Sequence, residues 1–382
     1  MMSSADEPAG AALIDAVDSK VSAVRTRSLD ISFNELVDMY KSGELQIQPD
    51  FQRLFRWTEG AQSRLIESLI LELPLPPIYM LEVEEGTYEL IDGLQRISSY
   101  LHFRGELLID GELQPPFALL DCDIVPELNG LTYEQLPRAI EIKLKRNFIR
   151  AEILRKESDK RLRYYMFKRL NTGGTKLEDQ EIRNCTIRLL SDTFNSFIIE
   201  LSQDEAFRYC IDTVAEAQIN KKYDQELALR FFAFKNARER YKHAIGDFLT
   251  EYMEAVSEPD SGFDYDGERT VFSRTFAVLR AAAEATELGD KIFGTVDRNN
   301  RLKGQFSVYH YETLTLGLQP RIDSLDPSDQ EQMRNLGEKL LALKKSDELR
   351  QVTGGGKNDP VPFAERVRLG EQAVESVFGE PS

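Results

Sequence analysis

The sequence predicts an α+β protein, with a small mixed αβ domain followed by a mainly α-helical domain. Two observations lead to this prediction. Before about residue 156, segments in which apolar and polar residues alternate are interspersed with segments of helical spacing. After it, almost every apolar segment repeats with helical spacing. A length of 382 residues and a hydrophobic content of 41% suffice for two cores.

We therefore divide the chain into a flexible N-terminal tail over residues 1–28, an αβ domain over 29–156 and a helical domain over 157–382. The tail lacks the basic start and the long apolar core of a signal peptide. No run of about 18 apolar residues suggests a membrane span. We expect a cytoplasmic protein without a membrane contact, and the sequence leaves its oligomeric state open.

The first domain should begin with a helix, because Ser32 and Glu35 have the spacing of a capping box. Thr58 is expected to cap a second helix that ends before Pro74. A hairpin with strands over 77–83 and 87–91 follows, and then a helix over about 94–103. Residues 116–124 resemble a strand and 132–137 a helical turn. The alternation in 139–154 predicts two strands or one long bulged strand.

The second domain is predicted as a series of helices separated by loops. Helical spacing is clearest over 159–171, 178–191, 193–203, 225–241 and 246–258. Residues 258–268 and 351–362 are expected to be loops because they are rich in Gly, Pro and Asp.

The positions of the cysteines and histidines and the net charge of the chain argue against several classes of protein. The three cysteines and three histidines are scattered, which indicates neither a disulfide framework nor a zinc site. The net charge of −17 opposes general affinity for nucleic acid. Residues 141–169, however, hold eleven basic and four acidic residues. This stripe is either an anion or docking face or a set of charges that pair with acidic neighbours. Its candidate nucleic-acid or partner face comprises Lys143, Lys145, Arg150 and Arg155.

A second concentration of polar residues lies where the predicted strand over 87–91 meets the next helix. A helix that begins directly after a strand presents free N–H groups and the positive end of its dipole, which suits an anion. Gly93 would let the backbone approach a ligand, and Arg96 could bind a phosphate while contributing little to the core. Asp92 could hold a metal, orient Arg96 or accept a proton from water. Gln95 could orient a water or contact a base. The alternative is an ordinary turn.

Two further segments could contribute to a nucleotide site. Residues 48–57 place Arg53 and Arg56 among three aromatic residues, a combination that suits nucleotides but also suits a core with surface arginines. Residues 167–184 place Asn171 and a Gly-Gly pair between two helices, where the glycines most simply end a helix. No GxxxxGK[ST] phosphate loop occurs.

These motifs, in this order, resemble the GmrSD-type restriction-endonuclease N-terminal family, whose hallmark is DGQQR after a strand. The hallmark stands here as Asp92-Gly93-Leu94-Gln95-Arg96, with Leu94 in place of the first Gln. Further boxes of the family match Pro49, Gln52, Arg53 and Trp57, then Leu73 to Ile78, and then Arg169 to Asn184. Leu227 to Phe234 and the segment FAERVRLG near the C-terminus also align.

The resemblance implies a ParB/sulfiredoxin-like αβ domain that binds, and in some members hydrolyses, nucleoside triphosphates in defence against phage or modified DNA. It implies catalytic roles for Asp92, Gln95 and Arg96, with Asp92 also holding a divalent metal ion, expected to be Mg²⁺. The residues expected to bind the nucleotide are Gln52, Arg53, Arg56, Gly93, Asn171 and Gly173. No histidine lies in an HNH-type nuclease box, so we expect a member without the nuclease half.

Three functional hypotheses remain open from the sequence. The first is a metal-dependent nucleoside triphosphatase that acts as a sensor in a bacterial restriction-type defence system. The second is a non-catalytic subunit that binds DNA or a partner and controls a separately encoded nuclease. The third is a ParB-like nuclease. The basic stripe predicts only weak contact with duplex DNA, in the range of about 10⁻⁴ to 10⁻⁶ M.

Overall fold

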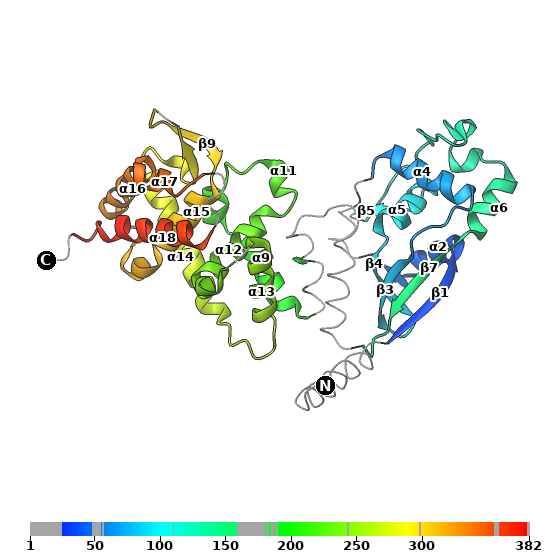
Figure 1. Cartoon of the computed structure of the whole chain (residues 1–382), viewed down its shortest axis with the longest axis horizontal. Helices are drawn as coiled ribbons and strands as arrows, with labels where there is room; N and C mark the ends of the chain where they lie inside the picture. Colours follow the sequence, from blue (N-terminus) through cyan, green and yellow to red (C-terminus); the bar gives the residue numbers. More distant parts are fainter. Residues whose placement is uncertain are drawn as a thin grey trace, which may run out of the picture. The chain divides into compact units, whose positions relative to one another are not determined.

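The computed structural model describes residues 25–47, 55, 57–109, 111–158, 180, 183–184, 187, 190–242, 244–297, 299–354 and 359–379. The chain forms two compact units, Met1–Leu177 and Glu178–Ser382, and each is described by itself (Figure 1). The first is mixed αβ with a small sheet and the second is mainly helical, which confirms the predicted fold class.

The first unit is built on a five-stranded sheet in the order β1-β7-β3-β4-β2. Its strands are β1 (Thr26–Ser32), β2 (Leu45–Gln46), β3 (Ile78–Glu84), β4 (Thr87–Asp92) and β7 (Phe148–Leu154). The pairs β1–β7 and β3–β4 are antiparallel, and β3–β7 and β2–β4 are parallel. The hairpin β3–β4 was predicted from the sequence, whereas β1 falls in a stretch for which we expected no strand.

Helices α2 (Phe33–Ser42), α4 (Glu59–Ile70), α5 (Leu94–Phe103) and α6 (Arg138–Arg146) accompany this sheet (Figure 1). The predicted caps are confirmed, because Ser32 Oγ accepts from the Glu35 N–H at 3.1 Å and Thr58 Oγ1 accepts from the Ala61 N–H at 3.3 Å. Short elements complete the unit: β5 (Leu108–Ile109), β6 (Glu112–Leu113), η1 (Pro126–Leu128) and η2 (Tyr133–Gln135).

The strand predicted over 116–124 is wrong. Two of its backbone N–H groups, those of Leu120 and Ile124, bond to side chains of α4, whereas the Leu119 N–H bonds to the Leu131 carbonyl. Ser63 Oγ accepts from the Leu120 N–H at 2.9 Å, and Glu67 Oε1 accepts from the N–H groups of Ile124 and Val125 at 3.0 and 2.6 Å. This irregular segment packs one side against α4. Its apolar residues therefore alternate with polar ones, which is also the pattern of a strand.

The prediction for 139–154 is wrong in its first half, which forms α6, and correct in its second half, which forms β7. Leu144 is buried and Ile140, four residues earlier, is half-buried, whereas Ile142 is 39% exposed. The i, i+4 pair, not the alternation, therefore defines the buried face. A second i, i+4 pair, Glu141 with Lys145 at 2.5 Å, also supports the helix.

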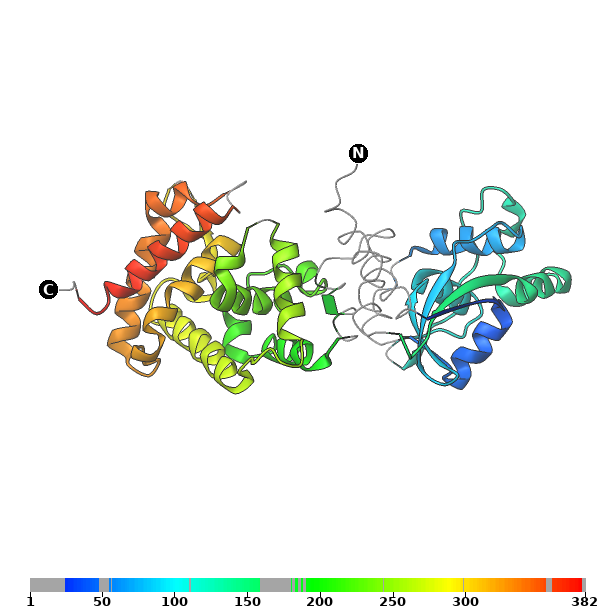
Figure 2. The same ribbon diagram turned by 60° about the horizontal axis from the view of Figure 1, so that its bottom comes forward.

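The second unit consists mainly of helices (Figure 2). Its helix α12 (Tyr223–Ala237) contacts α9 (Asp192–Leu201), α13 (Ile245–Val256) and α15 (Val308–Gly317). The other α-helices are α10 (Glu205–Cys210), α11 (Glu216–Ile219), α14 (Tyr265–Glu284), α16 (Gln330–Lys345), α17 (Asp347–Gln351) and α18 (Pro360–Glu375). The short helices are η3 (Arg238–Arg240), η4 (Gly289–Lys291) and η5 (Gln319–Ser324).

Three details of the second unit differ from the sequence prediction. The loop predicted over 351–362 is too long, because α17 ends at Gln351 and α18 begins at Pro360. A two-stranded hairpin, β8 (Gly294–Val296) with β9 (Leu302–Phe306), was not predicted. The loop predicted over 258–268 ends early, because Asp264 caps α14 by accepting from the Gly267 N–H at 3.0 Å. No helix among the described residues is long and apolar enough to cross a membrane.

A buried histidine joins this hairpin to α15. His310 Nδ1 lies 2.8 Å from the carbonyl oxygen of Gly294 and donates to it, because a carbonyl can only accept. Burial, reinforced by the nearby Lys344 ammonium, lowers the pKa of His310 to about 3. Lys344 is itself buried, and burial lowers its pKa to about 7. The folded state therefore favours a neutral imidazole at this position.

We predict that His310 makes the stability of the protein fall as the pH decreases from 6.5 towards 3. In that window the unfolded chain takes up a proton that the folded chain excludes, so acid favours unfolding. The variant His310→Asn keeps an N–H donor for the Gly294 carbonyl but cannot titrate. Melting temperatures measured across this window should fall less steeply for the variant. Parallel profiles would contradict the assignment.

Candidate functional site

The predicted motif lies where β4 meets α5. Asp92 is the last residue of β4, and α5 begins at Leu94. Gly93 between them has φ 106°, a left-handed conformation that favours glycine, and a Cβ atom there would clash with the side chain of Ile78. The glycine is therefore required by the joint itself. The N-cap Gly93 has no side chain, so among the described residues no side-chain cap bonds to the first N–H groups of α5.

Arg96 is held by three groups of the protein. Its Nη2 donates to Asp92 Oδ2 at 2.7 Å, and its Nη1 donates to the carbonyl of Pro77 at 3.2 Å and to that of Pro76. The Arg96 side chain is only 13% exposed, against 35% for Asp92. Burial lowers the pKa of Arg96 and the Asp92 carboxylate opposes that change. An arginine nevertheless stays protonated.

These contacts correct one expectation about Arg96. The sequence suggested a side chain that contributes little to the core, whereas the guanidinium connects the β4–α5 joint to the segment that precedes β3. The two proline carbonyls could not be anticipated from the sequence, because every residue has a backbone acceptor and residue type does not show which one is used. Three roles were considered for Asp92: holding a metal ion, orienting Arg96 and accepting a proton from water. The observed ion pair corresponds to the second of these, the orientation of Arg96.

Gln95 links this joint to the end of the 48–57 motif. Its Oε1 accepts from the Trp57 N–H at 3.1 Å. Gln62 Nε2 donates to the Trp57 carbonyl at 2.8 Å, so the Trp57 backbone is held from both sides. His102 Nδ1 lies 2.9 Å from Gln62 Oε1, which continues this connection along α5. Two motifs that are far apart in the sequence therefore meet at Trp57.

Several predicted site residues lie outside the described residues. They are Gln52, Arg53, Arg56, Asn171 and Gly173. Their roles in binding a nucleotide, and the expected proximity of Arg53 to Arg96, stay predictions. Among the described residues, no group of three or more His, Cys, Asp or Glu side chains is arranged to hold a metal ion. The expected metal role of Asp92 likewise stays a prediction.

The four residues of the predicted basic face all have acidic partners. Lys143 lies 3.4 Å from Glu72, and Lys145 lies 2.5 Å from Glu141. Arg150 donates two hydrogen bonds to Asp30, at 3.0 and 3.2 Å. Arg155 lies 3.3 Å from Glu82 and 3.4 Å from Glu157. Pairing with acidic neighbours, one of the two alternatives for this stripe, is thus observed at each of the four positions.

Comparison with known proteins identifies the domain that carries this joint. Residues 33–188 match the family described as GmrSD restriction endonuclease, N-terminal domain. The chain carries a GmrSD N-terminal domain. The predicted resemblance is thereby confirmed, and the match connects this domain with restriction-type systems. No curated protein and no solved structure shows a significant match to the chain. The GmrSD match includes the whole β4–α5 joint and extends to Gln180, Arg183 and Asn184.

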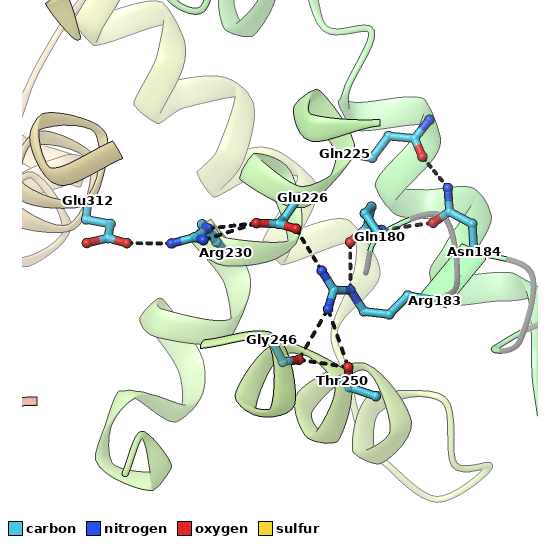
Figure 3. Close-up of polar contacts among 9 residues, drawn as sticks. All are labelled: Gln180, Arg183, Asn184, Gln225, Glu226, Arg230, Gly246, Thr250 and Glu312. Atoms are coloured by element: carbon cyan, nitrogen blue, oxygen red, sulfur yellow. Dashed lines mark hydrogen bonds and ion pairs between the residues drawn. The ribbon is translucent and has the colours of Figure 1, made fainter. Parts of the chain in front are cut away.

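These last residues belong to a buried polar network in the second unit (Figure 3). Arg183 Nη2 donates to Glu226 Oε2 at 2.9 Å, and Arg230 on the same helix as Glu226 donates to its other oxygen at 3.0 Å. Arg230 Nη1 also donates to Glu312 at 2.9 Å, and Glu312 accepts from Arg366 at 2.9 Å. Arg183, Arg230, Glu312 and Arg366 are all buried.

The amide side chains of the GmrSD-like box extend this network. Gln180 Oε1 accepts from Arg183 Nε at 2.9 Å, and Gln180 Nε2 donates to Asn184 Oδ1 at 2.8 Å. Asn184 in turn donates to Gln225 on α12 at 2.5 Å. Figure 3 shows these side chains directed towards one another from separate segments.

Sequence reasoning did not find this network as a unit. Three segments that resemble family boxes each contribute one arginine: Arg183 from 169–184, Arg230 from 227–234 and Arg366 from FAERVRLG. The available signal was an arginine inside an otherwise apolar helical segment, such as Arg230 in LALRFFAF. An arginine there must be either exposed or paired in the interior.

We predict that Glu312→Gln destabilises the protein by about 3–5 kcal/mol, because it leaves Arg230 and Arg366 buried without their shared carboxylate. The matched control is Glu365→Gln on α18, which breaks a pair with Arg368 whose side chains are 51% and 40% exposed. This control should cost at most about 1 kcal/mol. Chemical denaturation of both variants measures the difference, and equal losses would contradict a special role for the network.

Proposed function

We propose that the chain is a nucleoside-triphosphate-binding and hydrolysing regulatory protein of a bacterial restriction-type defence system against phage. The proposal includes control of a separately encoded nuclease. It rests chiefly on one observation: an Asp92–Arg96 ion pair stands at the N-terminus of α5, which no side chain caps, inside a GmrSD N-terminal domain. Backbone N–H groups and an arginine at a helix N-terminus suit a phosphate.

The geometry supports a defined role for each motif residue. Asp92 fixes the direction of the Arg96 guanidinium, so a phosphate would meet a group that is already oriented and loses little entropy on binding. Gln95 holds the Trp57 backbone and so connects the joint to the arginine-containing segment 48–57. In this proposal Arg53, Arg56 and Asn171 complete the contacts with the nucleotide.

The proposal also assigns a divalent cation, expected to be Mg²⁺, to Asp92. Protein sites for Mg²⁺ often supply only one or two carboxylates, with substrate phosphates and water completing the shell. A single partly exposed carboxylate beside a phosphate site is compatible with that arrangement. The ion would neutralise charge on the phosphoryl group during hydrolysis.

We predict that Arg96→Lys lowers affinity for nucleoside triphosphates by about tenfold to a hundredfold, because lysine keeps the charge but loses the planar fork. Calorimetry with several triphosphates and Mg²⁺ measures this loss. Glu141→Gln is the control, since it breaks another i, i+4 ion pair of the same unit. Wild-type protein that is folded but binds no triphosphate would refute the proposal.

We further predict that Asp92→Asn abolishes phosphate release while nucleotide binding is reduced much less. The amide can still accept a hydrogen bond from Arg96 but cannot supply the negative charge that a metal ion or an attacking water requires. Phosphate release and binding are to be measured on the same preparation. Loss of binding to the same extent as loss of hydrolysis would assign Asp92 to orientation of Arg96 alone.

A second candidate function is supported by the same contacts. Gln95 and Arg96 both bond to backbone groups of the protein, as expected of a motif that holds loops in place. The chain would then be a non-catalytic subunit that binds DNA or a partner. Nucleotide binding without phosphate release by the wild type would favour this alternative. DNA cleavage by the chain alone would instead favour the ParB-like nuclease.

A further inference from the structure

A groove of about 940 Å³ lies beside the segment that Arg96 supports. One wall is the turn after α4 with the proline-rich segment 72–77, and the other is formed by α6 and the first residues of β7. The Pro77 carbonyl accepts from Arg96, so the motif arginine holds one of the residues that line the groove. Asn147 Nδ2 donates to the Leu69 carbonyl at 2.6 Å and ties the two walls together.

The groove collects large apolar side chains that are exposed. Among the described residues, nine large hydrophobic side chains are exposed, and three of them line this groove: Leu73 at 42%, Ile142 at 39% and Phe148 at 61%. Pro74, Leu75 and Pro77 add further apolar surface between them. Single exposed apolar residues are ordinary, but a cluster of this kind on a concave surface indicates a binding site.

The backbone of one wall explains why Leu73 is exposed. Helix α4 ends in a Schellman motif, in which the Leu73 N–H bonds to the Ser68 carbonyl at 2.9 Å and the Glu72 N–H bonds to the Leu69 carbonyl at 3.1 Å. The left-handed position of this motif usually holds glycine, but here Glu72 occupies it with φ 55°. The residue after it commonly packs back onto the helix, whereas Leu73 faces the groove.

Cations surround the apolar surface. Lys143, Arg146 and Arg150 line the groove together with Glu72 and Asp30. Lys143 pairs with Glu72 and Arg150 with Asp30, and all four of these side chains are more than 40% exposed. Arg146 is exposed and has no acidic partner among the described residues. The groove therefore has one cation in excess, in a chain whose net charge is −17.

We propose that this groove docks a segment of a partner protein that combines large apolar side chains with carboxylates. The apolar side chains would cover Leu73, Ile142 and Phe148, and a carboxylate would pair with Arg146. Exposed ion pairs such as Lys143–Glu72 are weak, so a second carboxylate could compete with Glu72 for Lys143.

A protein segment fits this groove better than duplex DNA does. Affinity for duplex DNA comes chiefly from phosphate contacts, which use cations and have no need of six apolar residues in a concavity. A protein segment uses both the apolar surface and the cationic edge. This inference concerns the groove alone and does not depend on nucleotide hydrolysis at Asp92.

The test uses the full chain and a short fluorescein-labelled peptide with two leucines flanked by glutamates, followed by anisotropy. Two matched peptides carry serines in place of the leucines, or lysines in place of the glutamates. We expect saturable binding of the first peptide only. Binding of all three, or of none, would overturn the proposal.

Variants of adjacent residues locate the site. Arg146→Glu should weaken peptide binding by about tenfold or more, and Phe148→Ser should weaken it similarly. Lys145→Glu makes the same charge change on the same helix, but Lys145 does not line the groove, so this variant should leave affinity nearly unchanged. Glu72→Gln should strengthen binding, since it removes the internal competitor for Lys143.

Three results would contradict the groove assignment. Equal losses in Arg146→Glu and Lys145→Glu would show non-specific attraction to charge. Displacement of the peptide by duplex DNA at physiological salt, with the loss confined to Arg146→Glu, would assign the groove to DNA. Displacement by a Mg²⁺-triphosphate complex would place the nucleotide there. Failure of phosphate release, in contrast, would affect only the proposed function.

Discussion

The Arg96 guanidinium is the constraint on which the first unit depends. It bonds at once to Asp92 at the end of β4 and to the carbonyls of Pro76 and Pro77, just before β3. Prolines lack an N–H, so this segment cannot be fixed through an ordinary backbone ladder. A side chain with several donors in a plane can instead hold two carbonyls and a carboxylate together. One residue thereby contacts a helix N-terminus on one side and a segment that lines a groove on the other.

Arginines that connect separate segments through hydrogen bonds also occur in the second unit, where three of them are involved. Three arginines, Arg183, Arg230 and Arg366, share two glutamates, and they come from three separate segments of the chain. Removing charges from water is costly, so such a network contributes less to stability than its bond count suggests. Its geometry requires each helix to keep one register, because a displaced guanidinium would lose its carboxylate. We therefore interpret it as a device that specifies how α12, α15 and α18 pack.

The arrangement of charge in the first unit separates two kinds of surface. Lys145 and Arg155 are neutralised by neighbouring acids, so they add little to a field that could attract phosphates. Arg146 is exposed, lies in the groove with apolar side chains and has no acidic partner among the described residues. Within the described part of the stripe, residues 141–158, the fold therefore separates paired cations from the segment next to the groove, where charge and apolar surface lie together.

The sequence by itself determined the fold class, the caps at Ser32 and Thr58, the hairpin β3–β4, helix α5 and the resemblance to the GmrSD domain. These depend on local geometry and on patterns within a few residues. Tertiary structure decided the rest. Alternation in 139–146 predicted a strand, but these residues form a helix in which Leu144 and Ile140 face the interior. The segment predicted as a strand over 116–124 lies against α4, where Ser63 and Glu67 accept hydrogen bonds from backbone N–H groups. The partners of Arg96 and of the buried arginines are set by contacts between distant segments. Such contacts cannot be derived from one sequence, because the sequence shows which residues are charged but not which residues they contact.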